Sequence, residues 1–158
     1  MTDPSPGTDA TAVNALLGYR LRRAYAAMMA DFAEVFAPMG LRTSLLAALL
    51  LIESNPGIIA SELGATLAIK RANMVPLLNE LEAAGLIVRE PAPDDRRATA
   101  LRLSPKGQAK LPEIKRRLAD HEARFASRMT AAEYALLMDL LGRLQEDAGE
   151  HGDQSPKG

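Results

Sequence analysis

The sequence contains no cysteine and only two histidines among its 158 residues. The absence of cysteine excludes disulfide bonds, thiolate metal ligands and thiols that sense peroxide. Because histidine and cysteine are the usual ligands of transition metals, we expect no metal site and no cofactor.

Tryptophan is also absent, and aromatic residues make up only 4% of the chain, whereas hydrophobic residues make up 47%. Many of these hydrophobic residues are leucine and alanine, which favour helical packing over a β-sandwich. A chain of 158 residues is about the size of one domain. We therefore expect a single, mainly α domain.

Signatures of catalysis are missing as well. His121 is followed by Glu122, as in the helical motif of zinc proteases, but the second histidine of that motif is absent. The chain has no Gly-x-Ser-x-Gly sequence, and Gly64 does not begin a phosphate-binding loop. We therefore expect no catalytic residues and no enzyme.

The chain shows no apolar stretch of about 18 uncharged residues and no leader with a small-residue cleavage site. We therefore expect a cytoplasmic protein without a membrane partner. The formal net charge of -1 argues against a protein that coats nucleic acid by bulk charge. Any DNA site must be local, and the cations of residues 70–103 suit one, because both tails are acidic.

Residues 70–103 contain the most informative pattern in the chain, a helix followed by a charged hairpin. The apolar residues of the helix recur at intervals of three or four, which places them on one face: Met74, Leu77, Leu78 and Leu81. Gly85 predicts the end of this helix, and residues 86–88 and 98–103 predict two strands around a tip rich in Pro and Asp. Helix, strand, tip and strand together predict a winged helix.

Further helices are predicted on both sides of this stretch. They cover residues 12–37, 43–53, 58–67, 104–127 and 130–147. The short helix at 58–67 and the helix at residue 71 form a helix-turn-helix. Residues 1–9 predict a disordered arm, and residues 148–158 predict a disordered tail.

Three motifs connect these elements to a known family. They are LNELEAAGLIVRE at residues 78–90, Asp-x-Arg at the hairpin tip, and LRLSPKG at residues 101–107. In this order the chain resembles the MarR family of bacterial transcription regulators over roughly residues 12 to 147. The resemblance implies a MarR-like domain over residues 10–147, with a winged helix at about 41–103 and dimerisation helices at about 12–37 and 104–147.

The first and last helices also carry more apolar surface than a winged helix can cover. The simplest cover is a second copy of the chain, so we expect a homodimer.

The helix that contains Met74 presents a row of residues at its start that point away from its apolar face: Lys70, Arg71, Ala72, Asn73, Val75 and Pro76. In a major groove, arginine can hold guanine and asparagine can hold adenine by paired hydrogen bonds. The alternative is an ordinary solvated helix face. The resemblance implies that Arg97 enters a minor groove and that Asp95 orients it, with Arg96 beside them, whereas a solvated hairpin tip is the alternative for this trio.

The long first helix carries a second apolar stripe, which predicts either core, dimer interface or a ligand pocket: Tyr25, Met29, Phe32 and Phe36. The resemblance implies an effector site between the dimer helices and the winged domain. The stripe would face this site. Four cations on neighbouring helix faces can accompany it: Arg20, Arg23, Arg116 and Arg117. Arginines near an aromatic slot favour an anionic aromatic ligand, either an aromatic acid or its CoA thioester.

Together these patterns predict a homodimeric winged-helix repressor that binds a palindromic double-stranded DNA operator and is released by a small-molecule effector. The rival hypothesis is a winged-helix protein-interaction module that does not read DNA.

Overall fold

The computed structural model describes residues 9–91 and 99–150, with side chains as far as residue 145. Its contacts divide the chain into two units, Met1–Leu118 and Ala119–Gly158. The expected mainly α fold with a small β-wing is confirmed. The elements are α1 (Thr11–Asn14), α2 (Leu17–Phe36), the 3-10 helix η1 (Ala37–Met39), α3 (Thr43–Ser54), α4 (Ala60–Thr66), α5 (Arg71–Ala83), β1 (Ile87–Pro91), β2 (Thr99–Leu103), α6 (Pro105–Ala126) and α7 (Ala131–Glu150).

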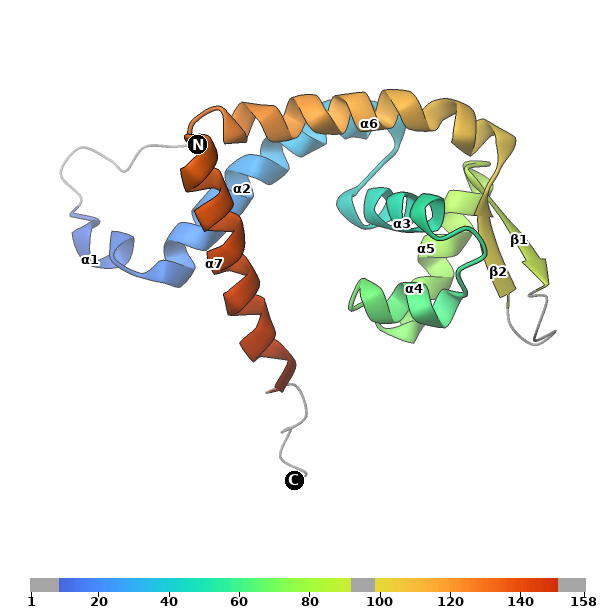
Figure 1. Ribbon diagram of the computed structural model, residues 1–158, viewed down its shortest axis with the longest axis horizontal. Coiled ribbons are helices and arrows are strands. Elements are labelled where there is room, and N and C mark those ends of the chain that lie inside the picture. The colour runs from blue at the N-terminus through green and yellow to red at the C-terminus, as the bar shows by residue number, and fades with distance from the viewer. Residues whose placement is uncertain (1–8, 92–98, 151–158) are drawn as a thin grey trace. The chain divides into compact units, whose positions relative to one another are not determined.

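The winged helix lies within the first unit and consists of α3, α4, α5 and the hairpin β1–β2. These elements are gathered together in Figure 1. The two strands pair antiparallel, with Ile87 opposite Leu103 and Pro91 opposite Thr99. The helix-turn-helix turn passes through Ala68, whose φ of 52° is left-handed. The predicted order of one helix and two strands is therefore confirmed, whereas the predicted tip lies outside the described residues.

The third helix begins later than the sequence predicted, at Ala60 and not at Ile58. The preceding segment pairs with β2 instead, because Gly57 donates its N–H to the carbonyl of Leu101 at 2.9 Å. Leu101 in turn donates its N–H to the carbonyl of Ile58 at 2.9 Å. Since these backbone groups are used by the hairpin, they are not available for the first turn of a helix.

The first helix is interrupted, although the sequence predicted a continuous helix over residues 12–37. α1 ends at Asn14, and α2 begins at Leu17 after Leu16, whose ψ of 121° is extended. The carbonyl of Asn14 accepts a hydrogen bond from Arg20 Nε at 2.5 Å. A side chain thus supplies the donor that a backbone N–H would supply in an unbroken helix.

One hydrophobic core joins elements of the first unit. α5 contributes the face that its periodicity predicted, and each of these side chains is at most 4% exposed: Met74, Leu77, Leu78 and Leu81. α3 is buried on most sides through Leu45, Leu46, Ala48, Leu49 and Ile52. From α2, Phe32 and Phe36 stack with ring centroids 4.5 Å apart. Because one face of α5 is fixed in this core, its opposite face must point to solvent.

In the second unit, α7 begins at the capping box that the sequence predicted. Thr130 donates its N–H to Glu133 Oε2 at 2.8 Å, and Glu133 donates its N–H to Thr130 Oγ1 at 3.3 Å. The hydrogen bonds from Thr130 hold the pKa of the Glu133 carboxyl below its usual value. α7 reaches Glu150, beyond the expected end at residue 147, so residues 148–150 are helical and the prediction of a tail from residue 148 was wrong there.

Within residues 9–91 and 99–150, no single helix has both the length and the apolar composition to cross a membrane. The stretches Leu17–Met39 and Thr43–Ser54 meet that test only as a pair bent by 70°. The second stretch is α3, whose apolar residues fill the core.

The burial of Phe36 generates the first prediction. Phe36 is 0% exposed, so Phe36→Ala should lower the free energy of unfolding by about 3 to 5 kcal/mol through lost apolar burial and the cavity left behind. Urea denaturation at one fixed protein concentration measures this change. Val75→Ala is the matched control, because Val75 is 56% exposed and should change the free energy by less than about 0.5 kcal/mol. Equal effects of the two substitutions would contradict the position of Phe36 in the core.

Candidate nucleic-acid interface

The row of residues predicted to contact DNA lies on the solvent-facing side of α5. Lys70 is the N-cap residue, with φ of -59° and ψ of 142°, and α5 begins at Arg71. All six residues of the row, Lys70, Arg71, Ala72, Asn73, Val75 and Pro76, are exposed. Pro76 has no N–H, so the helical hydrogen bond to the carbonyl of Ala72 is not made and this acceptor remains on the exposed face.

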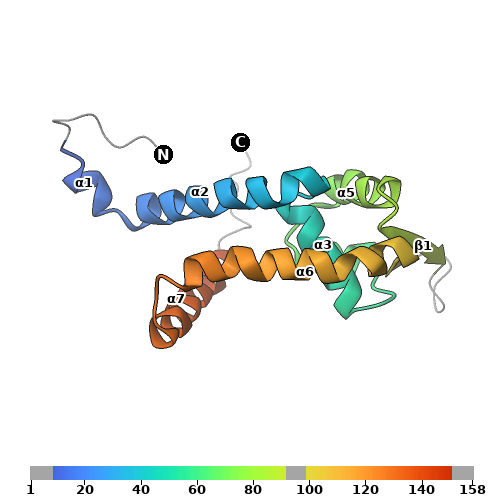
Figure 2. The same ribbon diagram turned by 90° about the horizontal axis from the view of Figure 1, so that it is seen from above.

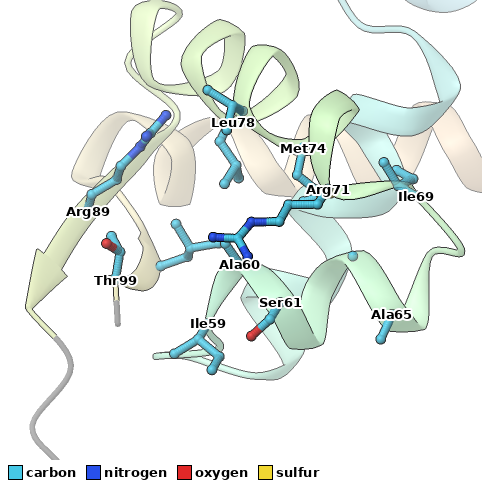
Figure 3. A pocket seen from close by; sticks show the side chains of 13 residues that line it. Ile59, Ala60, Ser61, Ala65, Ile69, Arg71, Met74, Leu78, Arg89 and Thr99 are labelled. Atoms are coloured by element: carbon cyan, nitrogen blue, oxygen red, sulfur yellow. The ribbon is translucent and has the colours of Figure 1, made fainter. Parts of the chain in front are cut away.

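Arg71 also lines a cavity of about 620 Å³ between α4, α5 and the hairpin. Figure 3 shows its side chain reaching across this cavity from α5, with Arg89 on the far side. The floor is apolar, whereas both arginines and Ser61 bring polar groups to the rim: the lining residues are Ile59, Ala60, Ser61, Gly64, Ala65, Ile69, Arg71, Met74, Val75, Leu78, Arg89, Thr99 and Leu101. The sequence did not predict that Arg71 and Arg89 share one cavity, because they come from different elements.

Arg89 ties the hairpin to α5. Its Nη2 donates to Asn79 Oδ1 at 2.6 Å, and its Nε lies 3.1 Å from Glu82 Oε2 as an ion pair without hydrogen-bond alignment. The Arg89 side chain is 28% exposed, so these contacts are only partly screened by water. The orientation of the hairpin relative to α5 is therefore held by side chains as well as by the core.

A second arginine neutralises the other acidic group on the outer face of α5. Arg42, the N-cap residue of α3, places its Nη2 2.7 Å from Glu80 Oε2. Glu80 and Glu82 thus each lie against an arginine, whereas unpaired carboxylates would repel DNA phosphates. Because both carboxylates are paired with arginine, the outer face of α5 is suited to binding a polyanion.

The tip residues Asp95, Arg96 and Arg97 lie outside the described residues. β1 ends at Pro91 and β2 begins at Thr99, so the described strands bracket the tip. The predicted roles of the tip residues stay predictions.

The four apolar residues predicted to bind an effector lie in three different environments. Met29 and Phe32 line a cavity of about 370 Å³, together with Ala33, Ala37, Gly40, Leu41, Arg42, Thr43 and Glu80. Phe36 is fully buried in the core, whereas Tyr25 is 61% exposed. The predicted stripe therefore contributes to core, cavity and open surface at different positions.

The cations predicted near this stripe have other contacts. Arg20 donates to the Asn14 carbonyl, and the Arg23 guanidinium lies 5.8 Å from the centroid of the Tyr19 ring. Arg117 pairs with Glu113 at 2.7 Å and holds the pKa of that carboxyl below its usual value.

Arg116 is exposed on α6 and has interactions of its own. The cation that lines the cavity with Phe32 is Arg42, which sequence reasoning missed. In the sequence, Arg42 is marked only by its position directly before an apolar helix.

Metal binding has no support from the part of the chain that the structure describes. Within it, no three His, Asp or Glu side chains come close enough together to hold an ion.

Comparison with known proteins places this geometry in context. The sequence model of the MarR family matches residues 40–98. A protein of Thauera aromatica described as a putative transcriptional regulatory protein for the hcr operon is 34% identical over 135 residues, covering 85% of this chain and 81% of its own length.

Two solved structures of one repressor are also similar. The transcriptional repressor CouR bound to a 23-mer DNA duplex is 35% identical, with a TM-score of 0.83, and the match covers 87% of this chain and 98% of that one. CouR bound to p-coumaroyl-CoA is 33% identical, with a TM-score of 0.77, covering 87% of this chain and 96% of that one.

The contact between Arg89 and Asn79 generates a prediction about this interface. In a double-mutant cycle of Arg89→Met and Asn79→Ala, urea denaturation should show a coupling energy of about 0.5 to 1.5 kcal/mol, because the donor is charged but water partly screens the Arg89 side chain. The exposed pair Arg102 and Glu90, 3.3 Å apart, is the comparison and should show a smaller coupling. Additive effects of Arg89→Met and Asn79→Ala would show that the link does not hold the hairpin.

Proposed function

The chain belongs to the MarR family of winged helix-turn-helix transcription regulators, and from this premise we propose that it is a homodimeric repressor of a palindromic DNA operator, released by an anionic aromatic effector. The observation that carries the DNA-binding part is the exposed row formed by Lys70–Asn73, Val75 and Pro76, on a helix whose opposite face is fixed in the core. The relative from Thauera aromatica and CouR are described as regulators and not as enzymes.

DNA reading is proposed to use two elements in different ways. Arg71 and Asn73 are proposed to enter the major groove and hydrogen-bond base edges, since these side chains suit guanine and adenine. At the wing, Arg97 is proposed to enter the minor groove, with Asp95 orienting it and Arg96 close to the phosphates. The pairing of Glu80 and Glu82 with Arg42 and Arg89 supports this proposal, because it removes repulsion from the same surface.

The homodimer is proposed from the apolar surface that single-chain packing leaves open. In the first unit, large apolar side chains of α1 and α2 are exposed: Val13, Leu16, Leu17, Leu21 and Tyr25. In the second unit, α7 exposes another set: Leu136, Leu137, Met138, Leu140 and Leu144. Monomeric proteins rarely leave so much contiguous apolar surface on one helix, and a two-fold dimer covers both sets with copies of themselves. Two-fold symmetry in the protein calls for a palindrome in the operator.

The effector is proposed to bind at the cavity of about 370 Å³ that Met29 and Phe32 line. Its size lies within the usual range for small ligands, and Arg42 offers a partner for a carboxylate. The related CouR binds p-coumaroyl-CoA, which supports an aromatic acid or its CoA thioester as the ligand class.

A bound anion can act on α5 through Arg42. In the free protein Arg42 pairs with Glu80, so a ligand carboxylate at Arg42 competes with Glu80 and weakens the link between α3 and the DNA-reading helix. Such a ligand lowers DNA affinity if it binds the form without that link more tightly.

Base reading and wing binding differ in their expected mutational signatures. Arg71→Ala and Asn73→Ala should each cost about 1 to 3 kcal/mol of binding free energy, mainly at one base position of the operator. Arg97→Ala should weaken binding to unrelated sequences as well and should reduce the salt slope by about one unit. Fluorescence anisotropy with selected and scrambled duplexes at several salt concentrations measures both effects.

Asp95→Asn is the matched variant for the wing, because it removes the orienting carboxylate and leaves Arg97 charged. It should reproduce part of the Arg97→Ala effect. An unchanged salt slope in Arg97→Ala would show that the wing does not contact DNA.

The effector proposal predicts which substitutions abolish release from DNA. Benzoates, hydroxycinnamates and their CoA thioesters should lower operator affinity of the wild type about 5- to 150-fold, the usual range of allosteric coupling. Phe32→Leu should reduce this response while operator binding persists without ligand. Arg42→Met removes both the ligand's partner and the link to Glu80, so it should lower operator affinity without ligand and leave little further response to the ligand.

Arg23→Met separates this cavity from the site predicted by sequence. Loss of the response in Arg23→Met but not in Arg42→Met would favour the sequence-predicted cations over the cavity. Release of DNA by peroxide or zinc, with no response to aromatic anions, would refute this effector class.

A further inference from the structure

The C-terminus of α5 meets the N-terminus of α6 at a junction formed by Ala84–Leu86 and Ser104–Gly107. α5 ends in a left-handed Gly85, with φ of 69°. Gly85 donates its N–H to the Glu82 carbonyl at 2.8 Å, and Leu86 donates its N–H to the Leu81 carbonyl at 2.9 Å. This pair of bonds is a Schellman motif, which satisfies two of the last helical carbonyls and leaves those that follow without a helical donor.

The next three carbonyls all accept hydrogen bonds from the start of α6. Lys106 Nζ donates to the carbonyl of Ala84 at 2.7 Å. Ser104 Oγ donates to the carbonyl of Gly85 at 2.5 Å, and Ser104 N–H donates to the carbonyl of Leu86 at 3.0 Å. The positive charge of Lys106 is also favourable at this position, because the C-terminus of a helix carries partial negative charge.

The same residues form the first turn of α6. Ser104 Oγ accepts the N–H of Gly107 at 2.9 Å, so one hydroxyl bonds both the end of α5 and the start of α6. A Cβ on Gly107 would lie 2.1 Å from the Leu86 carbonyl oxygen, a distance that no side chain tolerates. Ser104 and Gly107 are both buried, so the two helix ends are in close and specific contact. Figure 2 shows the first turns of α6 beside β1, which follows this junction.

We propose that Ser104, Lys106 and Gly107 are positioning residues that fix the orientation of the DNA-reading helix α5 relative to α6, and thereby set which operator spacing the protein accepts. They are not proposed to touch bases. This inference rests on the proposed function, since operator spacing has meaning only for a dimer that reads DNA.

The physical reason is that the three hydrogen bonds accepted by residues 84–86 can all form only when the two helices cross at one orientation. α5 is 13 residues long and its exposed row lies at the end far from the junction, so a rotation of α5 at the junction moves that row by much more than it moves the junction itself. In a symmetric dimer both recognition helices shift together, and the distance between them changes. Weakening the junction should therefore broaden the accepted spacing before it destabilises the fold.

Lys106→Met is the most selective test, because it removes the donor and the charge while keeping the length of an exposed side chain. Operators are first selected with the full-length wild type from random duplexes, and then rebuilt with one base pair inserted or deleted between the half-sites. We expect Lys106→Met to lose about fivefold to tenfold affinity at the selected spacing, a loss of the size of one ordinary net hydrogen bond, because the orientation of α5 is no longer held before DNA binds. Its affinity for the duplexes with altered spacing should change little, so the ratio of affinities between selected and altered spacing falls.

Two variants provide the controls. Lys110→Met removes the same charge one turn further along α6 and should lower affinity equally for every spacing, if at all. Lys106→Arg keeps a charged donor and should restore the wild-type preference. The melting temperature of Lys106→Met should fall by no more than about 4 °C, the shift expected when one hydrogen bond is lost from a domain of this size, and the other variants should melt close to the wild type.

Each outcome decides the inference. The inference is overturned if the operator-spacing preference of Lys106→Met is narrower than that of the wild type or the same. It is also overturned if Lys106→Met and Lys110→Met lose operator affinity equally, because Lys106 would then act only through its positive charge. A wild type that selects no palindrome refutes the proposed function, and the positioning role falls with it. A selective loss in Lys106→Met with recovery in Lys106→Arg supports the inference.

Discussion

Burial of one face of α5 is the constraint on which the rest of the structure depends. Met74, Leu77, Leu78 and Leu81 are held in the core, and each contributes roughly 1.5 to 3 kcal/mol relative to exposure. With these residues in the core, the first turns of α5 present Lys70–Asn73, Val75 and Pro76 outward. A shift of one residue in the apolar pattern would rotate the buried face by about 100° around the helix axis and change which residues point outward. The position of the candidate DNA-reading residues is therefore a consequence of packing and needs no local bond of their own.

The polar contacts around α5 then restrict the freedom that packing leaves. Arg42 links the helix to α3, Arg89 links it to the hairpin, and Lys106 links its end to α6. Each cation neutralises either a carboxylate or the negative end of a helix, so one set of contacts both orients α5 and lowers the negative charge near it. Removal of any one link is expected to change binding more than folding, because these side chains are partly exposed while the core is closed. A chain with a net charge of -1 can therefore still present a local surface suited to DNA.

The position and the end of α5 could be predicted from the sequence. The predicted helix ended at Gly85 and the structure has α5 as Arg71–Ala83, because apolar spacing and a left-handed stop are encoded in neighbouring residues. Pairings between distant residues were not predictable: Ile58 joins the hairpin through Leu101, and Arg42 reaches Glu80 across the winged helix. The periodicity of the second stripe, which includes Phe32 and Phe36, predicts that another element covers it. Periodicity does not predict which element that is. The roles of Asp95, Arg96 and Arg97 came from family resemblance alone.

Hydroxyl-radical footprinting on a selected duplex tests the central claim most directly, since it records where a symmetric pair of α5 helices meets DNA. Our account predicts two equally protected patches, related by the dyad of the palindrome, with centres about one helical turn or 10 base pairs apart. Protection should disappear on a duplex of scrambled sequence at the same protein concentration and salt. A single unsymmetrical patch, or equal protection of selected and scrambled duplexes, would contradict sequence reading by a dimer.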